Sequence, residues 1–366
     1  MSTILAALTY KYVENPIRNH PALKSSAMKS LGIGLTLSIV VAIFAIGLSM
    51  TNFRHLTDRP IVSVPTPTSV DVNNSAVINE LIFNLSPKLT TSDLSPVSLE
   101  TVENAVRDDP ITNDNGCHTE EGTDFLPDNC YFAKESGINL IVLFGNSHAN
   151  QFFSALENAA NDLDLRLLHR TRSGCSVADV TTTRGGTPWD SCNQWRTAAV
   201  EEMVKLKPAV VVMVGGLTVS GVIDPNTGNA ATEERKQELT IFGLRSTVKS
   251  LTDAGIKVIF IRDTPNLFAN PVDCLAARTV ESCVQPMNGA LESTETSTGA
   301  VQNMTNVTPV DLTLALCQIS TCAPVRGGIV VWRDDHHLTN SYSKELAPLF
   351  KSLIEPLLVP NSATIP

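Results

Sequence analysis

Residues 138–148 read INLIVLFGNSH, and this stretch decides the fold. Its apolar, β-branched run predicts a buried strand of a parallel sheet that ends at Gly145. Apolar residues then recur at helical spacing, which predicts a helix over residues 149–162. Ser147 lies between the two elements, at the carboxyl end of the sheet, where helix amides can receive a developing negative charge. This is the placement that a nucleophilic serine needs, although serine is also a common N-cap of helices.

A serine hydroxyl is a poor nucleophile without a base, and the candidate base lies 190 residues further along. Residues 331–339 read VWRDDHHLT, in which Asp334 and His337 are three positions apart. That spacing allows a carboxylate to orient an imidazole from the neighbouring turn. The sequence therefore predicts Ser147 as nucleophile, His337 as base and Asp334 as the orienting carboxylate.

The same segment has a second interpretation as a metal site, because Asp334, Asp335, His336 and His337 are all possible ligands. No third ligand group is apparent elsewhere in the sequence. We therefore expect no metal, and no cofactor bound by this chain.

From about residue 110 the chain alternates between short apolar runs and longer amphipathic segments, which predicts an α/β domain over residues 109–366. Its parallel sheet is expected to carry helices on both faces, with the active site beyond the carboxyl ends of the strands. Ser147 follows the first predicted strand and Asp334–His337 follow the last. The predicted strands are 138–144, 165–169, 209–214, 257–261 and 329–332, and the predicted helices are 149–162, 193–206, 232–254 and 341–358.

Residues 31–50 form an uncharged apolar run of 20 residues. A helix of this length spans about 30 Å, the thickness of the hydrocarbon core of a bilayer. The run is long for a signal peptide, and no clear cleavage site follows it. Residues 1–30 are predominantly basic, so we expect them in the cytoplasm and everything after residue 50 outside it. The predicted localisation is the inner (plasma) membrane, with a single pass and a periplasmic or otherwise extracytoplasmic C-terminal domain.

Residues 51–108 contain prolines interspersed with Ser, Thr and Asn, and their hydrophobic periodicity is broken. They are predicted to form a stem or linker with one short helix near residues 77–83. The net charge of −10 and the absence of a basic stripe in the outer portion argue against nucleic-acid binding.

All eight cysteines follow the predicted membrane segment, which suits an oxidising compartment. They fall into four short-range couples. Eight cysteines allow 105 pairings, so the spacing alone does not fix the connectivity. A zinc site is the rival interpretation, but the sequence contains no Cys-x-x-Cys pair.

Gly145-Asn146-Ser147-His148 and Asp334-x-x-His337 resemble the first and last blocks of the SGNH (GDSL-like) hydrolase superfamily. The nearer resemblance is to the SGNH domain fused to membrane acyltransferases of the acyltransferase-3 type, which O-acetylate cell-surface glycans and lipopolysaccharide. Residues 8–18, LTYKYVENPIR, resemble the segment that closes the acyltransferase-3 membrane domain. The order of the cysteines after residue 170 also resembles the pattern of the fused domain.

This resemblance implies an SGNH-hydrolase-like (flavodoxin-like) sheet and assigns further residues. Gly174 corresponds to the second block, where a loop amide donates to the oxyanion. Asn146 replaces the aspartate most common at its position and is expected to keep a local hydrogen bond. Together with Gly215, these residues are expected to contribute to binding of the oxyanion or the substrate. The third block usually carries an asparagine after the middle strand, but Gly215 here is followed by Gly-Leu-Thr. The resemblance also favours sequential disulfides, namely Cys117–Cys130, Cys175–Cys192, Cys274–Cys283 and Cys317–Cys322.

A multi-span acyltransferase needs about ten apolar segments, and only residues 31–50 form a full one. The resemblance therefore implies that this chain is a C-terminal piece, with an acyl donor such as acetyl-CoA handled by a separate membrane acyltransferase. The expected function is O-acetyl transfer to hydroxyls of a cell-surface glycan, lipopolysaccharide or peptidoglycan. A carbohydrate O-acyl esterase and a non-catalytic glycan-binding domain are the alternatives, the latter favoured by the missing asparagine.

Overall fold

The computed structural model of the protein describes residues 11, 78, 80, 82, 96–123, 125–215, 221–287, 295–317 and 321–358. The chain divides into two compact units, Met1–Pro67 and Thr68–Pro366, and every described residue except Lys11 belongs to the second. The predicted membrane segment, residues 31–50, lies outside the described residues. Within the described part, no helix is both long enough and apolar enough to cross a bilayer.

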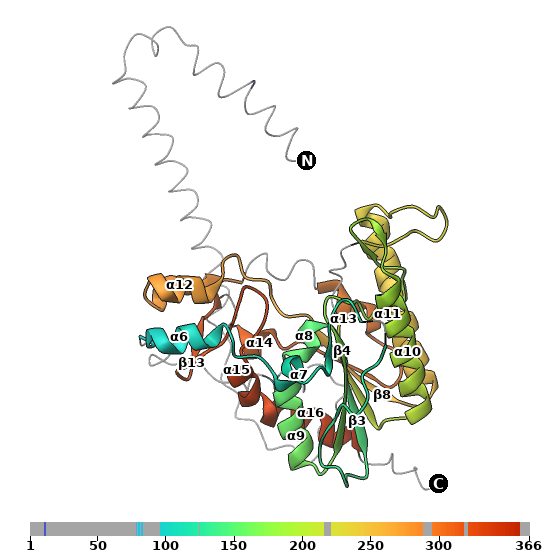
Figure 1. Ribbon diagram of the computed structural model, residues 1–366, viewed down its shortest axis with the longest axis horizontal. Helices are drawn as coiled ribbons and strands as arrows, with labels where there is room; N and C mark the ends of the chain where they lie inside the picture. Colours follow the sequence, from blue (N-terminus) through green and yellow to red (C-terminus); the bar gives the residue numbers. More distant parts are fainter. Residues whose placement is uncertain are drawn as a thin grey trace. The chain divides into compact units, whose positions relative to one another are not determined.

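A seven-stranded sheet forms the centre of the second unit (Figure 1). Six strands are parallel in the order β1-β4-β3-β7-β8-β10, and β2 pairs antiparallel with β4. The strands are β1 (His118–Thr119), β2 (Tyr131–Ala133), β3 (Leu140–Gly145), β4 (Arg166–Arg172), β7 (Val210–Gly215), β8 (Lys257–Arg262) and β10 (Val307–Val310). The mostly parallel α/β sheet predicted from the sequence is confirmed.

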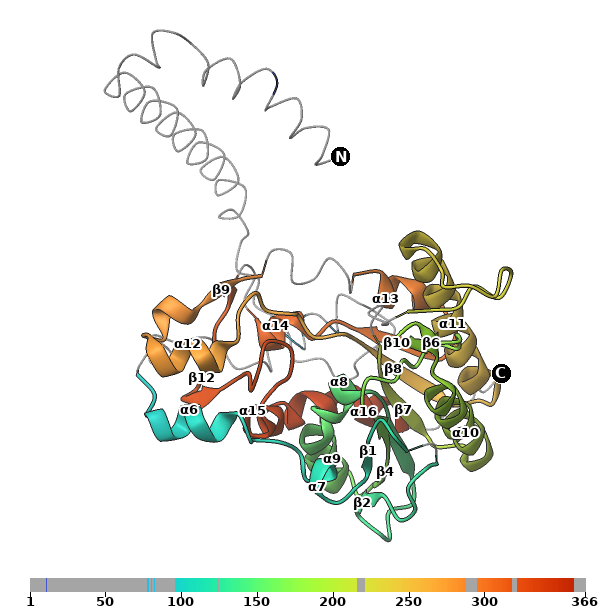
Figure 2. The same cartoon turned by 45° about the horizontal axis from the view of Figure 1, so that its top comes forward.

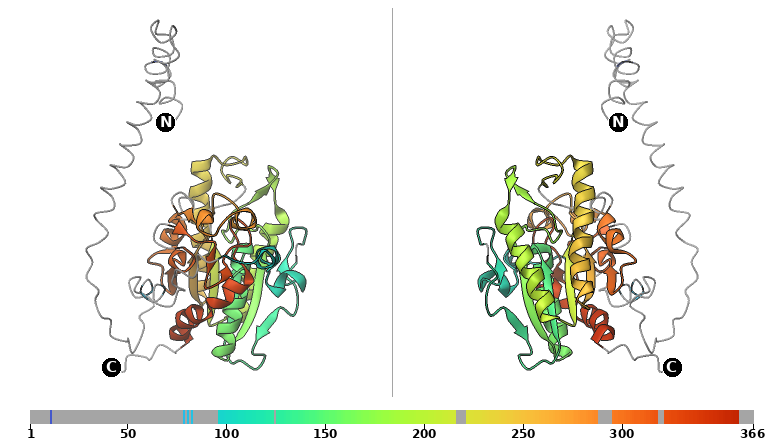
Figure 3. Two further views of the ribbon diagram at one scale, coloured as in Figure 1. Left: turned by 90° about the vertical axis from the view of Figure 1, so that its left-hand side faces the viewer. Right: turned by 90° about the vertical axis from the view of Figure 1, so that its right-hand side faces the viewer.

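Helices cover both faces of the sheet because alternate residues of each buried strand point to opposite sides. In β3, Ile141 and Leu143 join one hydrophobic cluster, while Val142 and Phe144 join another. The first cluster packs under α9 (Phe153–Asp162), α15 (Asn340–Glu345) and α16 (Ala347–Leu358). The second packs under α10 (Asp190–Leu206), α11 (Glu233–Asp253) and α13 (Glu295–Val301) (Figure 2). The right panel of Figure 3 looks onto α10 and α11.

A smaller group of elements adjoins one end of this body (Figure 1). Here α6 (Leu99–Ala105) packs on α12 (Pro271–Ala277), and Val102 is buried beside Val272 and Val330. The remaining short elements are α7 (Ile111–Asp114), α8 (Ser147–Asn150), β5 (Thr183–Arg184), β6 (Thr187–Pro188), a 3-10 helix (Glu281–Cys283), β9 (Gln285–Pro286), α14 (Thr313–Leu316), β11 (Thr321–Cys322), β12 (Val325–Arg326) and β13 (Ile329–Val330).

Part of the predicted stem belongs to this folded unit. Ile78 and Ile82 lie in the hydrophobic core, and α6 contributes Val102 to the smaller cluster. Ile78 and Ile82 are one helical turn apart, so both can face the core from a single helix face. Residues 78, 80 and 82 are helical, as predicted near residues 77–83, but the sequence did not show that this part of the stem packs into the core.

The prediction of the last strand was wrong. Residues 329–332 were expected in the central sheet, but β13 pairs antiparallel with β12 in a separate hairpin. The last parallel strand, beyond β8, is instead β10, which contains Pro309 and pairs with β8 alone among the described strands. Proline lacks an N–H donor and is tolerated at a sheet edge, so this strand lacks the usual sequence signal. The other four predicted strands correspond to β3, β4, β7 and β8.

The cysteines form four disulfides between sequential partners, in the arrangement that the resemblance implied. They are Cys117–Cys130, Cys175–Cys192, Cys274–Cys283 and Cys317–Cys322. Cys175–Cys192 joins the loop after β4 to the first turn of α10. This disulfide therefore anchors the loop that carries Gly174.

Candidate active site

The turn from β3 into α8 places Ser147 at the carboxyl edge of the sheet. A Cβ atom on Gly145 would lie 2.6 Å from the Cβ of Ala149, so only glycine allows the helix to begin this close to the strand. The Asn146 side chain accepts a hydrogen bond of 2.9 Å from the His148 amide and caps the short helix. Asn146 therefore caps the helix that carries Ser147, and any role of it in binding substrate remains a prediction.

A tight turn after β13 holds Asp334 and His337. The antiparallel bridge between Trp332 and Leu338 closes the base of this turn. The Asp334 Oδ1 accepts hydrogen bonds from the amides of His336 and His337, at 2.9 and 2.6 Å. Such local bonding to the backbone is typical of aspartate in turns.

The structure brings the three predicted residues together. The Nδ1 of His337 is 2.8 Å from Asp334 Oδ2, and its Nε2 is 2.9 Å from Ser147 Oγ. The second distance lies within the range expected for a nucleophile and its base. Leu338 N donates to Gln151 Oε1 at 2.7 Å, which connects the turn to the junction between α8 and α9.

The surroundings of His337 favour its neutral form. Burial, with a smaller contribution from the nearby His148, outweighs the hydrogen bond that His337 donates to Asp334 and lowers the pKa of His337 to about 4. For Asp334, burial raises the pKa, but its bonds to His337 and the two amides outweigh that effect and hold the pKa well below the ordinary value. At neutral pH this is a neutral imidazole oriented by a carboxylate, able to accept the serine proton.

A second histidine–aspartate pair lies beside the first. His148 follows Ser147, and its Nδ1 forms a close ion pair with Asp263, just after β8. Burial lowers the pKa of His148, but the charge and hydrogen bond of Asp263 outweigh burial, so the net shift is upward. Asp263 was not among the residues predicted from the sequence. The only available signal was that it follows a predicted strand, as Ser147 does.

Gly174 lies in the loop after β4 and has a positive φ of +63°, a conformation that favours glycine. Val177 of the same loop would contact a Cβ placed on either Gly145 or Gly215, at 3.8 and 3.2 Å. The loop thus packs over the ends of β3 and β7, close to Ser147. Neither the Gly174 amide nor the Ser147 amide donates a hydrogen bond to another described residue.

Gly215 ends β7, and packing accounts for the glycine. A Cβ there would lie 2.9 Å from the ring of Phe260. The residues that follow, 216–220, which include the altered third block, lie outside the described part. Any role of Gly215 in binding substrate therefore remains a prediction.

Two groups of side chains in the described part could hold a metal ion. One contains His148, His336 and His337, and the other contains Asp334, Asp335 and His336. The first draws a third imidazole from α8, which the sequence did not show to be near the DDHH segment.

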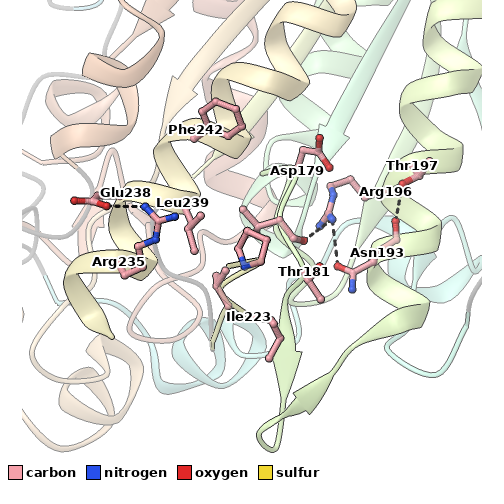
Figure 4. A pocket seen from close by; sticks show the side chains of 13 residues that line it. Asp179, Thr181, Asn193, Arg196, Thr197, Ile223, Arg235, Glu238, Leu239 and Phe242 are labelled. Carbon is pink, nitrogen blue, oxygen red and sulfur yellow. Dashed lines mark hydrogen bonds and ion pairs between the residues drawn. The ribbon is translucent and has the colours of Figure 1, made fainter. Parts of the chain in front are cut away.

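A separate pocket of about 690 Å³ lies between α10, α11 and the neighbouring loops (Figure 4). Its polar side chains are largely bonded to one another or to the backbone. Arg196 donates to the carbonyl of Val180, and Arg235 is paired with Glu238. Ser147, His337 and Asp334 do not line this pocket, so it is distinct from the candidate site.

The family comparison covers most of the described unit. Residues 116–352 match the model of the family described as "SGNH domain (fused to AT3 domains)". The chain belongs to this family. The matched SGNH domain includes Ser147, Asp334 and His337, whereas residues 1–115 lie outside the match. The acyltransferase-3 membrane part of the resemblance is therefore not shown.

Solved structures with some similarity to this SGNH domain include acyl-handling proteins. The periplasmic domain of a lipopolysaccharide acetyltransferase from Salmonella ser. Paratyphi A is 17% identical, with a TM-score of 0.44, covering 80% of this chain and 98% of that one. A GDSL-like lipase from Bacteroides thetaiotaomicron is 17% identical, with a TM-score of 0.37, covering 60% and 89%. A catalytic mutant of an acetylxylan esterase from Geobacillus stearothermophilus is 13% identical, with a TM-score of 0.32, covering 62% and 97%. No curated protein sequence matches the chain.

Proposed function

We propose that the SGNH domain is a serine acyltransferase that moves an acyl group, most simply acetyl, onto a hydroxyl of a cell-surface glycan, lipopolysaccharide or peptidoglycan. One observation carries the proposal. A continuous chain of hydrogen bonds runs from Asp334 through His337 to Ser147, with distances of 2.8 and 2.9 Å, at the carboxyl edge of the sheet. This is the arrangement that nucleophilic catalysis by serine requires.

In the first half-reaction, His337 Nε2 takes the hydroxyl proton as Ser147 Oγ attacks the acyl carbonyl. The tetrahedral intermediate collapses, the bond to the donor's leaving group breaks, and His337 returns the proton to that group. In the second half-reaction, a sugar hydroxyl gives its proton to His337 and attacks the acyl-serine ester. The second tetrahedral intermediate collapses, the bond between the acyl carbon and Ser147 Oγ breaks, and His337 returns its proton to Ser147 Oγ, so that the free serine is restored and the sugar carries the acyl group.

The negative charge of each tetrahedral intermediate requires hydrogen-bond donors. We propose the amides of Ser147 and Gly174, because neither donates to another described residue and the Gly174 loop packs over the end of β3. Asp334 fixes the tautomer of His337 and stabilises its charged form while the proton is held.

Transfer is favoured over hydrolysis by the family description, which couples this SGNH domain to acyltransferase-3 domains. In this proposal a multi-span acyltransferase handles a donor such as acetyl-CoA, and the SGNH domain acts on the outer side of the inner membrane. Water in place of the sugar hydroxyl would make the same site a carbohydrate esterase, so exclusion of water at the acyl-serine stage decides the outcome.

The nucleophile is tested with a fluorophosphonate probe and with hydrolysis of p-nitrophenyl acetate. We expect the probe to label Ser147, and Ser147→Ala to lose the label and about 10³-fold or more of the rate. Ser250→Ala, on the exposed face of α11, is the matched control and keeps both. Asp334→Asn keeps more activity than Ser147→Ala, because it disturbs only the orientation and charge of His337. Absence of labelling in folded wild-type protein would support the non-catalytic glycan-binding alternative.

Transfer and hydrolysis are separated by offering an acyl donor together with an O-deacetylated surface polysaccharide. Mass spectrometry of the polysaccharide detects transfer, and release of free acetate detects hydrolysis. A transferase acetylates the polysaccharide in a manner that depends on Ser147. Release of acetate alone, at a rate that the acceptor does not change, would identify an esterase.

A further inference from the structure

Three imidazole rings lie close together beside Ser147 in the candidate site. The ring centroids of His336 and His337 are 4.1 Å apart, and the His148 ring lies 5.0 Å from His337 and 5.3 Å from His336. Each residue offers one ring nitrogen within 4.8 Å of those of the other two. The catalytic step proposed above uses only one of these rings, and the cluster as a whole is not explained by it.

Each ring also has a carboxylate of its own. The Nδ1 of His148 pairs with Asp263, that of His336 lies 2.6 Å from Asp335, and that of His337 lies 2.8 Å from Asp334. A carboxylate on the second ring nitrogen is the usual partner of a histidine that binds a metal, because it fixes the tautomer and raises the basicity of the other nitrogen. The arrangement leaves the three Nε2 atoms as the possible ligands.

Imidazole nitrogens favour zinc and other late transition metals over calcium or magnesium. With Zn–N bonds of 2.0–2.1 Å, two nitrogens on a tetrahedral zinc ion lie about 3.4 Å apart. The cluster is therefore somewhat open and must contract to bind zinc. His336 can supply much of this movement, because 38% of its side chain is exposed and its Nε2 has no partner among the described residues.

We propose that His148, His336 and His337 bind one zinc ion and that this ion reversibly switches off the serine site. The inhibitory part of this inference rests on the proposed function, whereas the binding part does not. Zinc on His337 Nε2 takes the lone pair that would accept the proton of Ser147, so the hydroxyl keeps its proton. The fourth position on zinc is left to water, and Ser147 is not a ligand. Removing zinc restores the base unchanged, and no covalent bond is made or broken.

The binding part is tested by calorimetric titration of the full chain with ZnCl₂, using wild type and Ser147→Ala. Both should bind one zinc ion with similar affinity, since the serine is not a required ligand. His336→Ala should weaken binding more than tenfold. Asp335→Asn should weaken it about 10- to 100-fold, as removal of a carboxylate behind a ligand does. Asp253→Asn, an exposed carboxylate on α11, is the matched control and should bind like wild type.

The inhibitory part is tested with p-nitrophenyl acetate, normalising each variant to its own rate in EDTA. Zinc should inhibit wild type, EDTA should restore the rate, and His336→Ala should require more than tenfold more zinc for half inhibition.

Binding that survives His148→Gln but is lost in Asp335→Asn would place the ion on the acidic group instead and overturn the proposal. Zinc binding through the histidines without inhibition would overturn the switch. If even metal-free wild type is inactive, the proposed function fails, while histidine-dependent zinc binding still supports the site.

Discussion

Acid should destabilise the SGNH domain through His169, a histidine buried in its core. The ring is fully buried, with Nδ1 3.1 Å from the Cys117 carbonyl oxygen, to which it can donate, and Nε2 3.2 Å from the Thr171 hydroxyl, from which it can accept. Burial, with a smaller contribution from the nearby His118, lowers its pKa from 6.5 to about 3. Below pH 6.5, His169 therefore binds a proton in the unfolded chain but stays neutral in the folded protein. Stability from this residue is complete above pH 6.5 and is lost progressively as the pH falls toward 3.

The size of the effect follows from the two pKa values. At pH 5 the unfolded histidine is mostly protonated and the folded one is neutral, so the loss is about 2 kcal/mol at roughly 1.4 kcal/mol for each pH unit. Other groups titrate in the same range, and a variant isolates the contribution of His169. Replacing it with glutamine keeps a donor for the Cys117 carbonyl and removes the titration. We expect the destabilisation caused by His169→Gln to be about 2 kcal/mol smaller at pH 5.0 than at pH 7.5.

Urea unfolding of both proteins at the two pH values measures this difference. The control is Phe153→Leu, which alters a side chain whose ring lies 5.5 Å from that of His169 and carries no titratable group. Its cost should be nearly the same at both pH values. If the cost of His169→Gln is also independent of pH, the folded protein does not keep this histidine neutral, and the reasoning fails.

Three further predictions concern the frame around the site. Replacing both Cys175 and Cys192 with serine opens a loop of 17 residues and should lower the free energy of unfolding, measured by urea denaturation, by about 3 kcal/mol. An unchanged free energy of unfolding would mean that the disulfide does not constrain the unfolded chain. Gly215→Ala places a Cβ 2.9 Å from the ring of Phe260 and should lower the free energy of unfolding by about 1–3 kcal/mol. The control is Gly122→Ala, where the Cβ meets no atom within 4 Å and the free energy of unfolding should change little. Equal losses of stability in the two variants would argue against the packing role of Gly215. If residues 31–50 span the membrane as predicted, protease added outside spheroplasts should digest the SGNH domain, and full protection would contradict this topology.

The sequence predicts most clearly the strands that are buried on both faces of the sheet. Strands β3, β7 and β8 lie inside the sheet, pack on both faces, and therefore read as continuous apolar runs. The edge strands carry weaker signals. One of them, β1, has two residues, and β10 includes a proline, so neither was predicted. Residues 329–332 form an apolar run about as long as a strand of the central sheet, but they contribute to a hairpin outside it. Local periodicity does not distinguish a strand of the central sheet from a strand of such a hairpin.

The candidate site divides in the same way. Asp334 and His337 are three residues apart, and their hydrogen bond is local, so the sequence suggests it directly. Their meeting with Ser147, 190 residues away, was suggested because both segments were assigned to the carboxyl edge of one sheet. The assignment predicted the contact between Ser147 and His337 correctly, but the strand placed before Asp334 was wrong. The turn follows the β12–β13 hairpin rather than a strand of the central sheet, and it reaches Ser147 through the contact between Leu338 and Gln151.

The contact between His148 and Asp263 can be predicted from the geometry of the parallel sheet. Both residues lie just beyond the carboxyl ends of parallel strands, β3 and β8, and these ends share one edge with β7 between them. Any polar residue just after a correctly predicted parallel strand is therefore a candidate neighbour of Ser147, however far away it lies in the sequence. Applied to the predicted strand 257–261, this rule selects Arg262 and Asp263. Arg262 pairs with Asp311 after β10, which leaves Asp263 to orient the histidine beside the nucleophile.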